Sequence, residues 1–179
     1  MDNTPIINDK ELLNDIQEYR QHFDAIYVSG IPKLFNEDSA FLAFVSILTA
    51  IEALSGLFAP SKDTGVRFKL FVAAYFPIAY KPYTEKLWQF RNSMIHSFNP
   101  GPFALTCHTP RNHLKTMPTN IGDVPMLNIE DFYSTLLIAS GNYFESLLVE
   151  IDLQENFTKR VAHKEGGASQ TWEITEHKH

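Results

Sequence analysis

Three residues close together in the chain have side chains suited to phosphate chemistry. In the stretch from Glu85 to Phe98, E-K-L-W-Q-F-R-N-S-M-I-H-S-F, they are Arg91, Asn92 and His96. An imidazole titrates near neutral pH and can transfer protons, and a guanidinium presents a planar fork of donors that suits phosphate. Asn92 and His96 are four residues apart, so a helix would place them on one face.

The same stretch has the pattern of an amphipathic helix in which Arg91 is out of place. Pro82 fits a first helical turn, so a helix is predicted to begin near Tyr83. At about 100° per residue, one side of this helix is an apolar arc that contains Leu87, Phe90, Met94 and Phe98. Arg91 falls inside this arc, and a guanidinium is costly to bury without partners.

Two explanations of Arg91 are open. It can be a structural ion-pair partner in the core, with His96 an ordinary surface histidine. Alternatively, Arg91, Asn92 and His96 form a site. The step from Arg91 to His96 turns the helix by roughly 140°, so only a long arginine side chain or a second subunit would bring the two groups together.

The run Arg91-Asn92-Ser93-Met94-Ile95-His96 resembles the R-polar-x-x-x-H motif of the HEPN superfamily. Members of that family are all-helical domains found in toxin–antitoxin, phage-abortive and CRISPR-associated ribonucleases. The resemblance implies an all-α, four- to five-helix bundle over residues 1–155 that forms a homodimer, with two motifs lining one cleft. It equally allows a catalytically silent bundle that binds nucleotides or a protein partner such as an antitoxin.

The resemblance also implies a mechanism that needs neither a metal nor a cofactor. The 2′-hydroxyl of RNA attacks its neighbouring phosphate and leaves a 2′,3′-cyclic end. His96 would act as general acid or base, Arg91 would stabilise or position the phosphate, and Asn92 would orient His96 or the phosphate.

Composition predicts one soluble domain in a reducing compartment. The chain has 179 residues, 44% of them hydrophobic and 20% charged, which is typical of a globular protein with a sizeable core. Cys107 is its single cysteine, which excludes an internal disulfide framework. The start, M-D-N-T-P-I-I-N-D-K, lacks the basic and apolar runs of a signal peptide, so the cytoplasm is the expected location.

Positive charge is concentrated in the middle of an acidic chain. The net charge is −6, yet residues 62–115 contain eight Lys or Arg and only two Asp or Glu. A local basic patch is what phosphate binding requires, and the candidates for binding nucleic acid are Arg67, Lys69, Arg111 and Lys115. The alternative is that clustering along the sequence does not survive folding.

Glu52 is the only charged residue between Asp38 and Lys62. A run of this length would almost span a bilayer, but a carboxylate near its middle would be expensive there and no second span follows. We therefore predict the central helix of a bundle, with no membrane. Arg91 is then the economical partner for Glu52, unless Glu52 faces a subunit interface or a water-lined cleft.

Other helices are predicted at about 9–28, 64–76 and 128–153, each from apolar residues at helical spacing. Residues 99–128 contain prolines and glycines that exclude a long helix, so they are predicted to form an irregular loop with at most a short strand at Phe103–Thr106. This loop either faces the substrate or is a plain surface loop. Beyond residue 155, alternating runs around Gly166-Gly167 fit either a short C-terminal β-hairpin or an unstructured tail, 156–179.

Cys107, His108 and His113 lie within the predicted loop and are potential metal ligands. Their spacing fits no standard zinc site, and the sequence offers no apparent fourth ligand. No metal is therefore expected.

Overall fold

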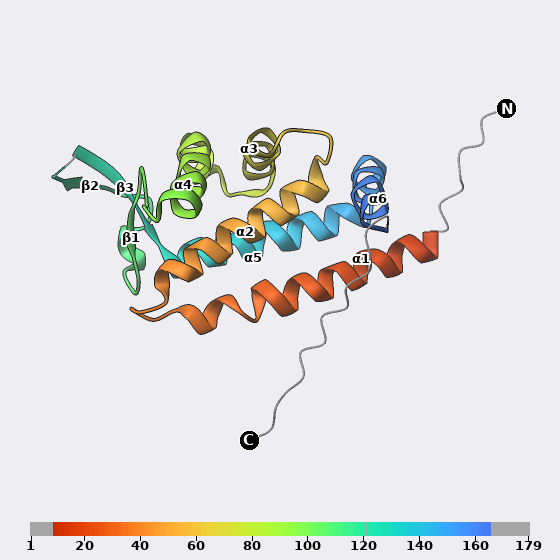
Figure 1. Cartoon of the computed structure of the whole chain (residues 1–179), viewed down its shortest axis with the longest axis horizontal. Coiled ribbons are helices and arrows are strands. Elements are labelled where there is room, and N and C mark those ends of the chain that lie inside the picture. Colours follow the sequence, from red (N-terminus) through yellow and green to blue (C-terminus); the bar gives the residue numbers. More distant parts are fainter. Residues whose placement is uncertain (1–8, 121, 166–179) are drawn as a thin grey trace, which may run out of the picture.

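Two long helices form the centre of the molecule, and a third lies along one side of them. The computed structural model describes residues 9–120 and 122–165. Helices α1 (Asp9–Phe23), α2 (Ala40–Phe58) and α5 (Ile129–Leu147) lie side by side, and α3 (Thr64–Tyr75) and α4 (Thr84–Ser97) cross them on one side (Figure 1). A small sheet covers one end of the long helices, and α6 (Ile151–Glu165) lies across the other. The predicted all-α bundle is confirmed.

Helix α2 is apolar because other helices surround it. It contacts α3, α4, α5 and α6, and most of its side chains are buried. The centroid of the Phe44 ring in α2 lies 5.9 Å from the ring centroid of Phe90 in α4 and 6.3 Å from that of Phe132 in α5. By length and composition α2 is the one helix of the described residues that could cross a membrane. Its place in the core accounts for that composition.

Irregular turns interrupt the helices near the predicted boundaries. Helix α1 is extended by a π-helical turn, η1 (Asp24–Val28), in which Ser29 N donates to Asp24 O at 2.8 Å. A 3₁₀ turn, η2 (Ile31–Leu34), leads on to α2. Pro77 follows the end of α3, and a second 3₁₀ segment, η3 (Ile78–Tyr83), precedes α4.

Much of residues 99–128 forms a sheet instead of the irregular loop that the sequence predicts. Strands β1 (Ala104–Thr106), β2 (Thr116–Thr119) and β3 (Gly122–Asn128) lie in the order β1-β3-β2, and a short 3₁₀ turn, η4 (Pro110–Asn112), separates the first two. Strand β1 is parallel to β3, with Leu105 opposite Leu127, and β2 is antiparallel to it, with Met117 opposite Val124. Only the short strand at Phe103–Thr106 matches the prediction. The rest was missed because each strand is short and β1 pairs with residues more than twenty positions further along the chain.

The C-terminal part of the described chain is helical. The predicted single helix to Leu153 is broken after Leu147, and α6 begins at Ile151. Leu153 and Phe157 are buried in the bundle core, and Asn156 Nδ2 donates to Phe58 O of α2 at 2.9 Å. The domain boundary expected near residue 155 thus falls inside α6.

The first alternating run of the expected hairpin belongs to α6, because Leu153, Phe157 and Val161 recur at helical spacing. Its remainder, residues 166–179, lies outside the described residues.

Candidate functional site

Helix α4 presents the motif at the edge of the core. Leu87, Phe90 and Met94 are buried, and they fix which face of the helix points inward. Arg91 and Asn92 are half-buried beside them, and His96 is exposed. The motif therefore lies partly in the bundle and partly at its surface.

Arg91 pairs with Glu52, as predicted from the two apolar segments. Arg91 Nε donates to Glu52 Oε2 at 2.7 Å, and Arg91 Nη2 forms an ion pair with the same oxygen. The arginine side chain is 15% exposed and the glutamate side chain 24%. The pair is thus at the rim of the core, open to water on one side, and not fully buried.

Two further contacts orient the guanidinium. Arg91 Nη1 donates to Asn92 Oδ1 at 3.1 Å, and Arg91 Cζ lies 5.4 Å from the centroid of the Trp88 ring. Trp88 rests on Gly65 of α3, where a β-carbon would be only 3.0 Å from the indole. Because Arg91 has five N–H donors, it keeps donor capacity for a further anion.

His96 stands apart from Arg91. Within the part of the chain that the structure describes, no hydrogen bond or ion pair connects the two side chains. Within one chain the two side chains are therefore not in direct contact, in agreement with the helical spacing.

Phe98 is not part of the apolar arc in which the sequence places it. Helix α4 ends at Ser97, and Phe98 adopts a left-handed backbone with φ 50° and a side chain that is 81% exposed. Asn99 N donates to Ser93 O, and Pro100 then prevents the helix from continuing. The end of α4 thus presents an aromatic ring two residues after His96.

The four predicted basic residues do not form one surface. Lys69 Nζ is 3.0 Å from Glu85 Oε2, so its charge is paired. Arg111 and Lys115 are exposed, in η4 and just before β2 at the sheet end of the molecule. Arg67, the fourth of these candidates, is half-buried.

Arg67 lies near Arg160, a residue that the sequence analysis did not single out. A β-carbon on Gly56 would lie 3.9 Å from Arg67 Cζ and 3.7 Å from Arg160 Nε, so both guanidinium groups rest on this glycine of α2. Arg67 Nε is buried without a hydrogen-bond partner among the described residues. Two adjacent cations with an unused donor favour an anion.

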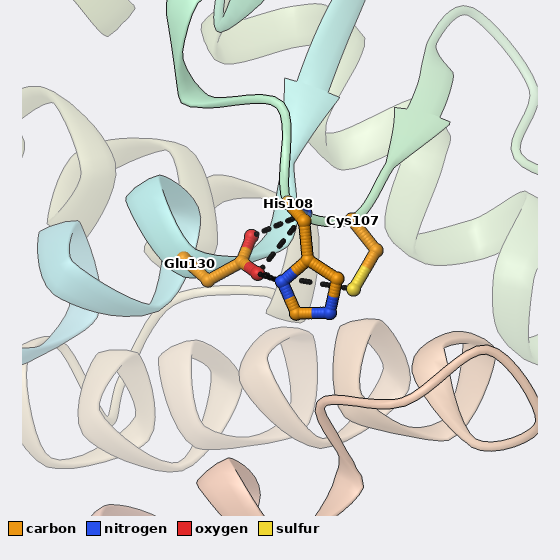
Figure 2. Close-up of side chains that lie close together, drawn as sticks. All are labelled: Cys107, His108 and Glu130. Atoms are coloured by element: carbon orange, nitrogen blue, oxygen red, sulfur yellow. Dashed lines mark hydrogen bonds and ion pairs between the residues drawn. The ribbon is translucent and has the colours of Figure 1, made fainter.

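A second cluster of reactive side chains lies where β1 meets the start of α5 (Figure 2). The ligand atoms of Cys107, His108 and Glu130 lie within 4.8 Å of one another. His108 Nδ1 is 2.6 Å from Glu130 Oε1, and Cys107 Sγ is 3.8 Å from the same oxygen. Sequence reasoning missed Glu130 because only the parallel pairing of β1 with β3 brings it beside Cys107.

The charges of this cluster affect its acid–base properties. Burial raises the pKa of Cys107, and the negative charges of Glu130 and Glu37 raise it further. Burial alone would raise the pKa of Glu130, but backbone N–H groups, including that of His108, and the His108 charge outweigh it and leave the pKa lowered. Cys107 is therefore a protonated thiol and not an activated nucleophile.

His113, grouped with Cys107 and His108 in the sequence, points elsewhere. His113 Nδ1 accepts a hydrogen bond from Asn128 N at 3.1 Å, and its Nε2 lies 2.7 Å from the Tyr80 hydroxyl oxygen. Tyr80 is in turn 3.0 Å from Thr135 Oγ1, within the core. His113 is a structural residue that joins the sheet to η3 and α5.

No family model, curated protein or solved structure matches this chain. The resemblance to HEPN domains is carried by the motif residues and by the helix on which they lie.

Proposed function

We propose that this protein is a metal-independent endoribonuclease of HEPN type, which acts as a homodimer. The observation that carries the proposal is the state of the motif on α4. Arg91 is fixed by Glu52 and Asn92 with donors to spare, while His96 is exposed at the same helix. A positioned cation and an accessible titrating group are the two parts that phosphate chemistry at neutral pH requires.

The reaction divides between the two side chains. His96 takes the proton of a ribose 2′-hydroxyl, whose oxygen then attacks the adjacent phosphorus. The bond from phosphorus to the 5′-oxygen breaks, and that oxygen receives a proton from a general acid. The imidazolium that forms when His96 takes the first proton can supply this proton. Arg91 stabilises the negative charge that develops on the phosphate oxygens.

The remaining features fit a single-stranded RNA substrate. The exposed Phe98 ring, close to His96, offers a surface on which a base can stack. Arg67, with Arg160, and the exposed Arg111 and Lys115 supply positive charge for backbone phosphates. Lys69, paired with Glu85, contributes less than the sequence suggests.

The proposed biological setting rests on the resemblance to HEPN domains. A ribonuclease of this type acts in toxin–antitoxin or phage defence in the cytoplasm, where an antitoxin protein would restrain it. The single cysteine of the chain fits that reducing compartment.

A second function is favoured by one specific observation. Arg91 already has a carboxylate partner, an amide partner and an aromatic neighbour. Such a residue can be purely structural, and the protein is then a catalytically silent HEPN-like dimer that binds nucleotides or a protein partner.

Cleavage of mixed RNA in EDTA separates the two functions. The ribonuclease produces fragments with 2′,3′-cyclic phosphate ends, and His96→Ala lowers the rate by roughly 10²–10⁴-fold, the usual worth of a general acid or base. His22→Ala is the matched control, because His22 is also exposed but lies on α1 outside the motif. An equal rate for His96→Ala would exclude the proposed mechanism.

A further inference from the structure

The structure brings together three different metal-ligating side chains that the ribonuclease mechanism does not use. Cys107 and His108 follow β1, and Glu130 lies in the first turn of α5. Figure 2 shows both the thiol and the imidazole directed toward the same carboxylate. We propose that Cys107, His108 and Glu130 bind a Zn²⁺ ion.

The backbone at His108 makes this convergence possible. In an extended chain, neighbouring side chains point to opposite sides. His108 instead has φ 59°, in the left-handed region that residues other than glycine seldom adopt. Its N–H donates to Glu130 Oε1 and Oε2 at 3.0 and 3.2 Å, so the turn is held against the carboxylate. A sparsely populated backbone conformation held by its surroundings is typical of a functional site.

The distances are close to those that a tetrahedral zinc ion requires. Zinc bonds of about 2.0–2.3 Å place neighbouring ligand atoms roughly 3.3–3.6 Å apart. Glu130 Oε1 is 3.8 Å from Cys107 Sγ and 2.6 Å from His108 Nδ1. Insertion of the ion moves the imidazole away from the carboxylate by less than about 1 Å. The His108 side chain is 68% exposed and free to make that movement.

The donor set selects zinc over other common cations. A thiolate ligand disfavours Mg²⁺ and Ca²⁺, which prefer oxygen, while zinc accepts sulfur, nitrogen and oxygen together. A thiolate and a carboxylate carry two negative charges, which neutralise Zn²⁺. Binding releases the thiol proton to solvent, and the imidazole keeps its proton on Nε2.

This site is separate from the motif on α4. The ion ties the segment after β1 to the start of α5 and leaves one coordination position for water. The proposal therefore does not depend on RNA cleavage, and its test uses metal binding alone.

Cobalt(II) is the probe, because its complexes with thiolates have a near-ultraviolet charge-transfer band. Cys107 is the only cysteine in the chain, so such a band can arise from this thiolate alone. We expect the full-length reduced protein to develop the band with Co²⁺ and to lose it when Zn²⁺ is added. Absence of a thiolate band would overturn the proposal.

Three variants and a control complete the test by Zn²⁺ titration calorimetry. We expect each of three variants to weaken Zn²⁺ binding: Cys107→Ser, Glu130→Gln and His108→Gly. Loss of an outer-sphere partner lowers metal affinity by roughly 10–100-fold, and loss of a direct ligand should lower it by at least as much. His108→Gly is the decisive variant, since glycine suits the left-handed backbone and keeps the fold. His22→Ala should bind as the wild type does.

The chain ends in E-H-K-H, whose His177 and His179 can themselves bind metal ions. Zinc binding that is lost in His177→Ala/His179→Ala and unchanged in His108→Gly would place the ion on the C-terminal segment and overturn the proposal. Full affinity in the tail variant, with weakened binding in His108→Gly, supports it.

Discussion

At the scale of single residues, Arg91 is the ion-pair partner of Glu52 and, in the proposed ribonuclease, also the residue that positions the phosphate. Its Nε and Nη2 atoms are committed to Glu52, which removes the cost of a lone cation at the core edge. The same bonds hold the guanidinium in a fixed orientation beside Asn92. A structural partner can thus also be a positioning residue, because a fixed guanidinium loses little entropy when it binds phosphate.

A double-mutant cycle separates the two roles of Arg91. Glu52→Gln leaves the guanidinium without a counter-ion. We expect the free energy of unfolding to decrease by about 2 kcal/mol, which lies between the values for exposed and for fully buried ion pairs. Combining Glu52→Gln with Arg91→Met should recover part of that loss. Urea unfolding of the four proteins measures the coupling, and additive losses would show that the two residues are independent.

The double variant also reports on function. A catalytic Arg91 predicts a protein that is stable but unable to cleave RNA. A purely structural Arg91 predicts a stable protein that retains cleavage.

The sequence could predict a contact only where both residues stand out from the pattern of their own segment. The pairing of Glu52 with Arg91 was predictable because each is the one charged residue on an otherwise apolar surface. Glu130 was not, since nothing within its own helix marks it as a partner of Cys107. Arg160 was missed because α6 itself was not recognised.

At the scale of elements, the sheet depends on a polar connection to the bundle. Asn128, the last residue of β3, donates its backbone N–H to His113 Nδ1, and its Nδ2 donates to Asp131 Oδ2 at 2.7 Å. Since Nδ1 accepts a hydrogen bond, His113 must be neutral with its proton on Nε2, directed to Tyr80. The helices were predictable from local periodicity, but this connection joins segments far apart in sequence and has no local signal.

The neutral state of His113 makes stability depend on pH. Burial lowers the pKa of His113, although the nearby charge of Asp131 partly opposes this. The unfolded chain therefore binds a proton at a higher pH than the folded chain does. The stabilisation is complete above the unfolded pKa of about 6.5 and is lost as the pH falls through the folded value.

When the pH is lowered from about 7.5 to about 5.5, we expect the urea midpoint of the wild type to decrease by more than the urea midpoint of His113→Gln does. Glutamine keeps an N–H donor for Tyr80 but does not titrate, so other groups contribute equally to both proteins. The same change of midpoint in the two proteins would assign the pH dependence to other residues.

At the scale of the whole molecule, the proposed ribonuclease would need a second chain to bring His96 beside Arg91. The helix directs the two side chains to different sides, and the described residues of one chain do not join them. A two-fold pairing of α4 helices would place the arginine of one protomer beside the histidine of its partner. Sedimentation at micromolar concentration should then give twice the mass of one chain.

Complementation between two inactive variants tests this composite site directly. One variant is Glu52→Gln/Arg91→Met, which keeps His96, and the other is His96→Ala, which keeps Arg91. In an equal mixture that has exchanged subunits, half of the dimers are mixed, and each mixed dimer has one complete site of two. We therefore expect about a quarter of the wild-type rate of RNA cleavage from two proteins that are each inactive alone. A mixture as inactive as its components, although native mass spectrometry shows mixed dimers, would mean that each protomer uses its own arginine and histidine. A clean monomer would remove the composite site altogether.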